Sequence, residues 1–139
     1  MANEVGHTNV GWEELPDYDM GTLPEDHPWP KKENLQLRVY SKPLRCEHMA
    51  FSIGRVGPGE SVSHHRHKES EEIYVLMQGR AQIRIGDAVF EAKQFDAYRV
   101  PAHIYRSVYN NSDEECWWMF MGAPIDEYLE NEDYNPEEA

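Results

Sequence analysis

Residues 59–79 read GESVSHHRHKESEEIYVLMQG and join a cluster of histidines to a strand-like apolar run. Successive side chains of an extended strand point to opposite faces, so His65 and His67 share one face while His64 takes the other. Two imidazoles at this spacing can bind one metal ion, and a carboxylate from the next strand would complete a set of two histidines and one carboxylate. Such a set suits Fe, Mn, Ni or Zn and leaves coordination positions open for substrate or water.

Short apolar or alternating runs on both sides of this stretch predict an all-β domain. Turn signals such as Pro58-Gly59 and Gly86-Asp87 separate them. Strands of this length and spacing are typical of a small antiparallel sandwich or barrel. We expect one short helix, after Pro124. The predicted strands cover residues 37–40, 49–53, 73–77, 81–85, 88–90, 97–100, 104–109 and 116–121.

The histidine-rich stretch resembles the first sequence motif of the cupin family. That motif runs from Gly59 through five residues to His65-x-His67, then through four residues to Glu72 and six more to Gly79, and the spacing matches throughout. The resemblance implies a small antiparallel β-barrel or jelly roll of the cupin type, with one divalent transition metal ion in the barrel mouth. It also implies a homodimer.

The resemblance implies His65, His67 and Glu72 as metal ligands. Glu71 is the rival carboxylate, but the six-residue spacing to Gly79 favours Glu72. Strand alternation agrees, because Glu72 shares a face with Tyr74 and Leu76 while Glu71 lies on the other face. The expected domain covers residues 37–125, between an extended, proline-rich N-terminal arm at 1–36 and an acidic tail at 126–139.

The second cupin motif is matched only in part. Pro101 and Asn110 agree with it, but His103 stands where the family often has glycine, and Arg106 stands where it has its last metal-binding histidine. Phe95, followed by an aspartate, likewise replaces the glycine of the usual Gly-Asp pair. The fold prediction rests on the first motif, and the chemistry depends on what takes the place of the missing histidine.

Arg106 has the strand parity of the ligand position, so we expect its guanidinium to point into the barrel. An arginine cannot ligate a metal, because it has no free lone pair at ordinary pH. His103 could supply a fourth ligand instead. Alternatively, three protein ligands hold the metal and Arg106 binds a carboxylate or phosphate of the substrate, which we favour. In a third alternative the arginine charge repels the cation and leaves a binding protein. Tyr74, Tyr98 and Tyr105 could supply pocket hydroxyls that act as hydrogen-bond donors or acids.

Charge is distributed unevenly along the 139 residues, whose formal net charge is −13. Residues 1–30 and 126–139 carry seven acidic residues each and no Lys or Arg, whereas residues 31–125 hold the other 12 acids and all 13 bases. We interpret the acidic ends as solvated segments. The acidic balance argues against nucleic acid or an anionic membrane as a partner, since both require clustered positive charge.

The compartment follows from weaker signals. The first residues carry no basic or apolar run, so we expect no secretory signal. No apolar stretch approaches the length of a membrane span. We therefore expect a cytoplasmic protein with Cys46 and Cys116 reduced.

The sequence favours a small metal-dependent enzyme of the cupin type. Its chemistry could be that of a dioxygenase, an isomerase or epimerase, a lyase or a cyclase, and Arg106 favours a small anionic substrate. The alternative is a non-catalytic cupin that binds a small molecule with a degraded metal site. A weaker third possibility is an interaction protein that works through its acidic ends.

Overall fold

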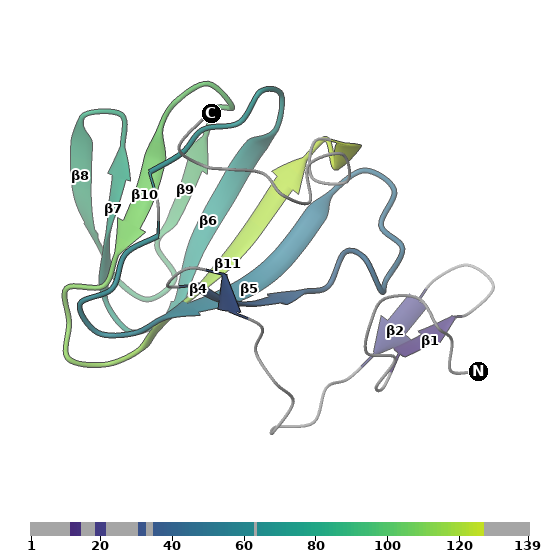
Figure 1. Cartoon of the computed structure of the whole chain (residues 1–139), viewed down its shortest axis with the longest axis horizontal. Helices are drawn as coiled ribbons and strands as arrows, with labels where there is room; N and C mark the ends of the chain where they lie inside the picture. The colour runs from purple at the N-terminus through teal and green to yellow at the C-terminus, as the bar shows by residue number, and fades with distance from the viewer. Residues whose placement is uncertain (1–11, 15–18, 22–30, 33–34, 63, 127–139) are drawn as a thin grey trace.

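The computed structural model describes residues 12–14, 19–21, 31–32, 35–62 and 64–126 (Figure 1). Every regular element in these ranges is a β-strand, and every strand pair is antiparallel, which confirms the predicted all-β class. The strands are β1 (Trp12–Glu14), β2 (Asp19–Gly21), β3 (Lys31–Lys32), β4 (Leu35–Val39), β5 (Ala50–Val56), β6 (Glu71–Gln78), β7 (Ala81–Ile85), β8 (Ala88–Ala92), β9 (Ala97–Val100), β10 (Arg106–Tyr109) and β11 (Cys116–Ala123).

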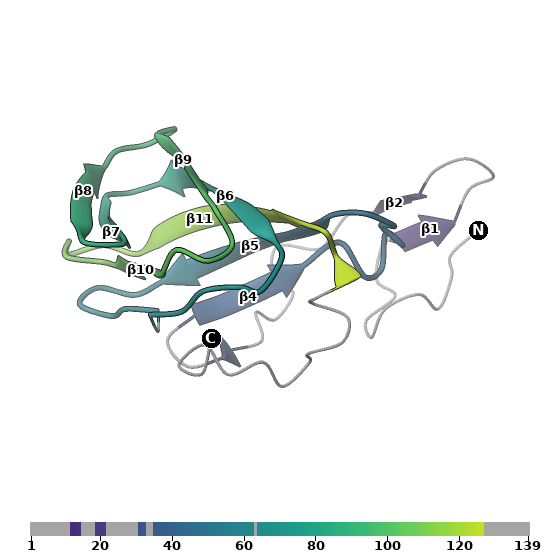
Figure 2. The same cartoon turned by 90° about the horizontal axis from the view of Figure 1, so that it is seen from above.

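Two sheets make up the barrel. The larger has the order β3-β4-β5-β11-β6-β9 and the smaller has the order β10-β7-β8, while β1 and β2 form a separate two-stranded sheet. Seen from above, the strands curve round so that the small sheet closes over the β9 side of the large one (Figure 2). This arrangement confirms the small antiparallel barrel that the sequence predicts.

The observed ends differ from the predicted ends in a few places. β3 pairs with β4, which begins at Leu35, so the large sheet starts slightly ahead of the predicted domain boundary at residue 37. β10 begins only at Arg106, because a turn after Pro101, closed by the Ile104 amide donating to the Pro101 carbonyl at 3.2 Å, occupies the first predicted residues. The predicted helix after Pro124 begins within the described residues, where Asp126 is helical, but the rest of it and most of the acidic tail lie outside them.

Inward-facing residues of both sheets form one core. Leu76 of β6, Ile83 of β7, Val108 of β10 and Trp118 of β11 are fully or almost fully buried there. Trp118 is the largest of the side chains that solvent does not reach, and Trp117 beside it is half-buried. The tryptophan pair therefore belongs mainly to the packed strand.

Two turns have backbone conformations that matter for the sequence pattern. Gly79 ends β6 at φ 86°, and a Cβ there would lie 3.0 Å from a backbone oxygen of the facing turn, so this motif position requires glycine. Phe95, between β8 and β9, has φ 73°, and its amide donates to the Leu76 carbonyl at 2.6 Å. A bulky residue in this left-handed region is strained.

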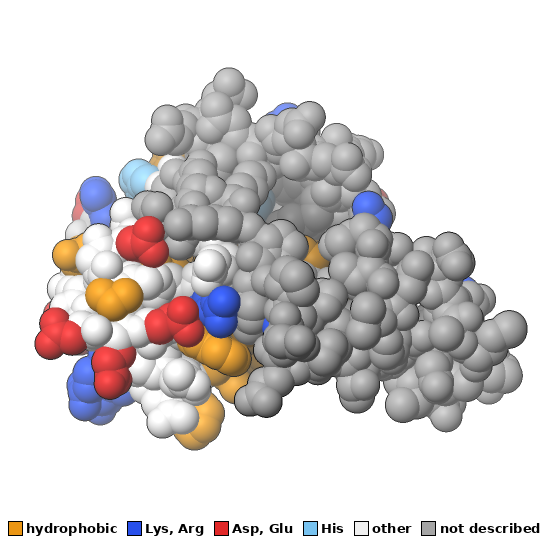
Figure 3. All heavy atoms as spheres, turned by 60° about the horizontal axis from the view of Figure 1, so that its bottom comes forward, with side chains coloured by type: hydrophobic (Ala, Val, Ile, Leu, Met, Phe, Trp, Pro, Cys, Tyr) orange, Lys and Arg blue, Asp and Glu red, His pale blue; other side chains and the backbone are white. Residues whose placement is uncertain are grey.

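The surface of the described region mixes acidic, basic and apolar side chains (Figure 3). This mixture agrees with the near-neutral charge counted for residues 31–125. The part of the chain that the structure describes holds no apolar helix of membrane-spanning length. Cys46 and Cys116 are not bridged, and burial raises the pKa of the Cys116 thiol to about 11.

Candidate metal centre

The histidine segment is held in an extended form against the chain that leads into β10. The His65 amide donates to the Arg106 carbonyl at 3.0 Å, and the Arg106 amide donates back to the His65 carbonyl at 2.8 Å. The His67 amide donates to the Ala102 carbonyl at 2.9 Å. With the backbone fixed in this way, His67 is buried and His65 half-buried, while His64 is exposed, as the predicted alternation requires.

Glu72 enters the same space from β6. It pairs in register with Val100 of β9 and Gly122 of β11, and its exposed fraction is only 7%. Glu71, by contrast, is exposed and forms an ion pair with Arg99 at 2.7 Å on the outside of the sheet. The structure therefore points Glu72 inward and its rival outward, as strand parity predicts.

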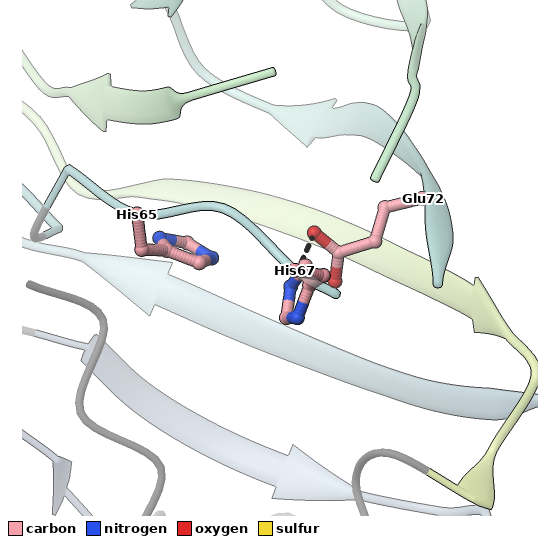
Figure 4. Close-up of side chains that lie close together, drawn as sticks. All are labelled: His65, His67 and Glu72. Carbon is pink, nitrogen blue, oxygen red and sulfur yellow. Dashed lines mark ion pairs between the residues drawn. The ribbon is translucent and has the colours of Figure 1, made fainter. Parts of the chain in front are cut away.

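The side chains of His65, His67 and Glu72 converge (Figure 4). One potential ligand atom from each lies within 4.8 Å of the others, and His67 Nε2 is 3.1 Å from Glu72 Oε1. Ligand atoms about 2.1 Å from a common ion lie up to about 4 Å apart, so small side-chain movements would close the set around one metal. Among the described residues, these two imidazoles and one carboxylate fit a divalent transition metal.

Arg106 is completely buried beside this group, which confirms that it points inward. Its Nη1 donates to Glu72 Oε1 at 2.7 Å and its Nη2 to the Pro101 carbonyl at 2.7 Å. Nε donates to the Ile104 carbonyl at 3.1 Å, and Nη2 also reaches the Ala102 carbonyl at 3.4 Å. Both ends of the guanidinium fork thus engage protein oxygens.

This geometry favours a role different from the one the sequence suggested for Arg106. We expected its fork to bind a substrate anion, but the fork is used to hold Glu72 and three carbonyls of its own loop. A side chain with no exposed surface has little access to a substrate. An anionic substrate, for which Arg106 was the argument, stays a prediction.

The charged and hydrogen-bonding neighbours of Glu72 favour its ionised form. Burial alone would raise its pKa, but the hydrogen bond and charge of His67, together with the charges of Arg106 and His65, outweigh burial and lower the pKa below its ordinary value. The carboxylate is therefore in the form that a metal ion requires.

The three predicted hydroxyls and His103 occupy different places. The Tyr74 hydroxyl donates to Glu72 Oε1 at 3.2 Å, and edge-on contacts with Trp118 and Phe120 hold its ring. Tyr105 contacts the ring of exposed His64, and the Arg66 guanidinium lies 4.9 Å over its centre. Tyr98 packs between the rings of Phe90 and Trp118. His103 is exposed and is not a member of the converging group. Tyr74 is thus joined to Glu72 of the metal group by a hydrogen bond, while the roles expected of Tyr98, Tyr105 and His103 stay predictions.

The pairing of Arg106 with Glu72 was not predicted from the sequence, although a signal for it existed. Strand parity placed both side chains inside the barrel. A buried guanidinium needs a partner of opposite charge, and Glu72 was the carboxylate on the inward face of β6. Applying this rule to both predicted side chains together would have suggested the pair.

Known proteins support the same assignment. A family model described as the cupin domain matches residues 52–122, just over half of the chain. A curated protein of Streptomyces cyaneus named polyketide synthase CurC is 29% identical over 77 residues, which cover 55% of this chain and 49% of that protein. The chain spans about half the length of that relative.

Solved structures agree in fold. A cupin 2 conserved barrel domain protein from Salinispora arenicola superposes with a TM-score of 0.65 at 23% identity, over 80% of this chain and 97% of that one. KdgF from Halomonas sp. superposes with a TM-score of 0.66 at 15% identity, over 76% of this chain and 94% of that one. Together with the first motif and the matched family model, these likenesses show that the chain belongs to the cupin family.

Proposed function

We propose that this cupin binds one divalent transition metal ion through His65, His67 and Glu72 and acts on a small molecule in the barrel mouth. The observation that carries the proposal is the convergence of one ligand atom from each of these residues within 4.8 Å. When bound, such an ion supplies Lewis-acid polarisation of a substrate oxygen or a redox-active centre.

The chain's own groups support this site. Arg106 and Tyr74 both donate to Oε1 of Glu72, which fixes the carboxylate where the two imidazoles converge. The Tyr74 hydroxyl donates to Glu72 at 3.2 Å, so it is the hydroxyl that we assign to the centre. The Tyr74 ring in turn packs edge-on against Trp118 of the hydrophobic core.

The reaction class stays open among dioxygenase, isomerase or epimerase, lyase and cyclase chemistry. The likeness to a protein named as a polyketide synthase supports beginning with polyketide-type substrates for cyclisation or oxygenation. Small sugars and sugar acids are the second panel. We also expect a homodimer, which light scattering would test.

Metal analysis tests the proposal directly. Protein purified without chelator, reconstituted with Mn²⁺, Fe²⁺, Ni²⁺ or Zn²⁺ and desalted, should retain about one ion per chain with at least one of these metals. His67→Ala should lose that ion. The matched control is His64→Ala, because His64 is a neighbouring but exposed histidine on the other face and its removal should leave the metal content unchanged. Equal metal retention by the two variants would contradict the proposed site.

A second candidate function follows from the state of Glu72. The Arg106 guanidinium, 2.7 Å away, already offsets the negative charge of Glu72, so this carboxylate does not need a metal ion to balance its charge. This observation favours a non-catalytic cupin that binds a small molecule. Thermal shifts caused by a ligand in the presence of excess chelator would support this function, whereas shifts that require the metal would support the first.

A further inference from the structure

Arg106 is linked to all three residues of the candidate metal centre. Its backbone forms a two-way bridge with His65. Its side chain donates to Glu72 Oε1 at 2.7 Å. The Ala102 carbonyl accepts from both the His67 amide at 2.9 Å and Arg106 Nη2 at 3.4 Å, so the same side chain also contacts the anchor of His67.

These links join protein atoms to one another and do not require a bound metal ion. Arg106 is the first residue of β10 and pairs in register with Ile85 of β7, so its position is set by the small sheet. From there its fork spans the distance to β6 and to the loop that begins at Pro101. The small sheet thereby fixes a carboxylate that belongs to the large sheet.

We propose that Arg106 is a positioning residue, which sets His65, His67 and Glu72 in their ligand arrangement before a metal binds and keeps the centre at three protein ligands. The proposal deepens the proposed function and rests on its metal site. Its claim about the metal-free protein, however, can be tested separately.

Lysine is the variant that separates positioning from charge. Arg106→Lys keeps one positive charge, but a single ammonium cannot reproduce the planar fork that engages Glu72 on one side and the Pro101 carbonyl on the other. Arg106→Met removes both the charge and the fork. The matched control is Arg99→Met, which breaks an arginine–glutamate pair of the same length between β9 and β6 on the exposed side of the sheet.

Amide hydrogen exchange in the presence of chelator tests the metal-free protein. In Arg106→Lys the backbone amides of His65 and His67 should exchange at least about tenfold faster than in the wild type, because local opening reports local stability. The core amide of Leu76 should keep its protection, and Arg99→Met should resemble the wild type at all three amides. Unchanged exchange at the histidines, or equal acceleration at Leu76, would overturn positioning.

Metal affinity provides a second readout, with Mn²⁺ as the probe in competition with a chelating dye. Loss of a partner that orients a ligand typically weakens metal binding about 10–100-fold. We expect a loss of that size for Arg106→Lys and no change for Arg99→Met. If Arg106→Lys binds Mn²⁺ as the wild type does while Arg106→Met binds it more tightly, the arginine acts by charge repulsion and the proposal is wrong.

The ligand number is tested by X-ray absorption of Zn²⁺-loaded protein. We expect two imidazoles around the metal in the wild type and three in Arg106→His. Three imidazoles in the wild type, with His103 as the source, would overturn the three-ligand claim. If the wild type binds no metal at all, the proposed function fails, and the exchange experiment still decides whether Arg106 positions the three side chains.

Discussion

The strained turn at Phe95 gives the sharpest test of the backbone described above. Phe95 has φ 73° and is 67% exposed, so its ring contributes little packing. Its Cβ is sterically strained by the left-handed backbone conformation. A Cβ in that conformation costs about 1–2 kcal/mol, and glycine escapes this cost. Against this gain, glycine lowers the free energy of unfolding by about 0.5–1 kcal/mol, because it has greater conformational freedom in the unfolded chain.

The comparison of two variants isolates the backbone effect. Phe95→Ala and Phe95→Gly both remove the ring, and burial of roughly a third of it limits that shared loss to about 1.5 kcal/mol. The variants differ only in the Cβ. We therefore expect Phe95→Gly to be more stable than Phe95→Ala by up to about 1.5 kcal/mol, which is strain relief of about 1–2 kcal/mol less an added chain entropy of about 0.5–1 kcal/mol.

Urea unfolding in excess chelator, followed by tryptophan fluorescence, measures the difference. The control is Ala97→Gly in β9, an exposed strand residue outside the left-handed region, where glycine should cost about 0.5–1 kcal/mol. The two sites should thus respond to glycine with opposite signs. If Phe95→Gly is less stable than Phe95→Ala, the strain at this turn is not what the backbone angle implies.

Three further predictions concern stability. Because the pKa of Glu72 is lowered from 4.5, its carboxylate stabilises the fold above about pH 4.5, and this contribution is lost as pH falls through the folded pKa. In metal-free protein, Glu72→Gln should therefore lose less unfolding free energy than the wild type between about pH 5 and 3. Parallel profiles of urea-derived unfolding free energy against pH for the two proteins would contradict this. Trp118→Ala should cost about 3–5 kcal/mol in urea unfolding, clearly more than Trp117→Ala, since only Trp118 is fully buried. Gly79→Ala should lower the urea midpoint of unfolding more than Gly59→Ala does, because a Cβ at Gly59 meets nothing within 4 Å while one at Gly79 meets backbone at 3.0 Å. Equal shifts in the midpoint would contradict the steric argument, since the positive φ that both glycines share would then explain the loss in both variants.

Much of the barrel could be predicted because its signals are local. Alternation fixed the extents of β7 and β9 to the residue, and the glycine that ends β6 marks a conformation that only glycine adopts easily. Ends without such signals were less accurate. β10 starts two residues later than predicted, because the turn after Pro101 is formed by a hydrogen bond that no residue type announces.

The candidate metal site, likewise, could be predicted from the sequence only in part. The inward direction of His65, His67 and Glu72 follows from strand parity and a family spacing, both of which are properties of one continuous stretch. The partner of Arg106 could not be read from any single stretch, since it depends on how β10 of one sheet faces β6 of the other. Long-range pairing of this kind decides whether an inward arginine meets a substrate or a neighbouring carboxylate.

The hydrogen bonds from Arg106 to its own loop also bear on how such a centre can change over time. A single substitution of Arg106 by histidine would offer a fourth ligand but would withdraw donors from the carbonyls of Pro101, Ala102 and Ile104 at once. The Pro101 and Ala102 carbonyls would keep the Ile104 and His67 amides as donors, so the loss falls mainly on the Ile104 carbonyl, at a cost of up to about 1–3 kcal/mol. A fourth ligand at position 106 is therefore gained at a cost in stability, and changes in the loop at 101–104 would have to offset that cost.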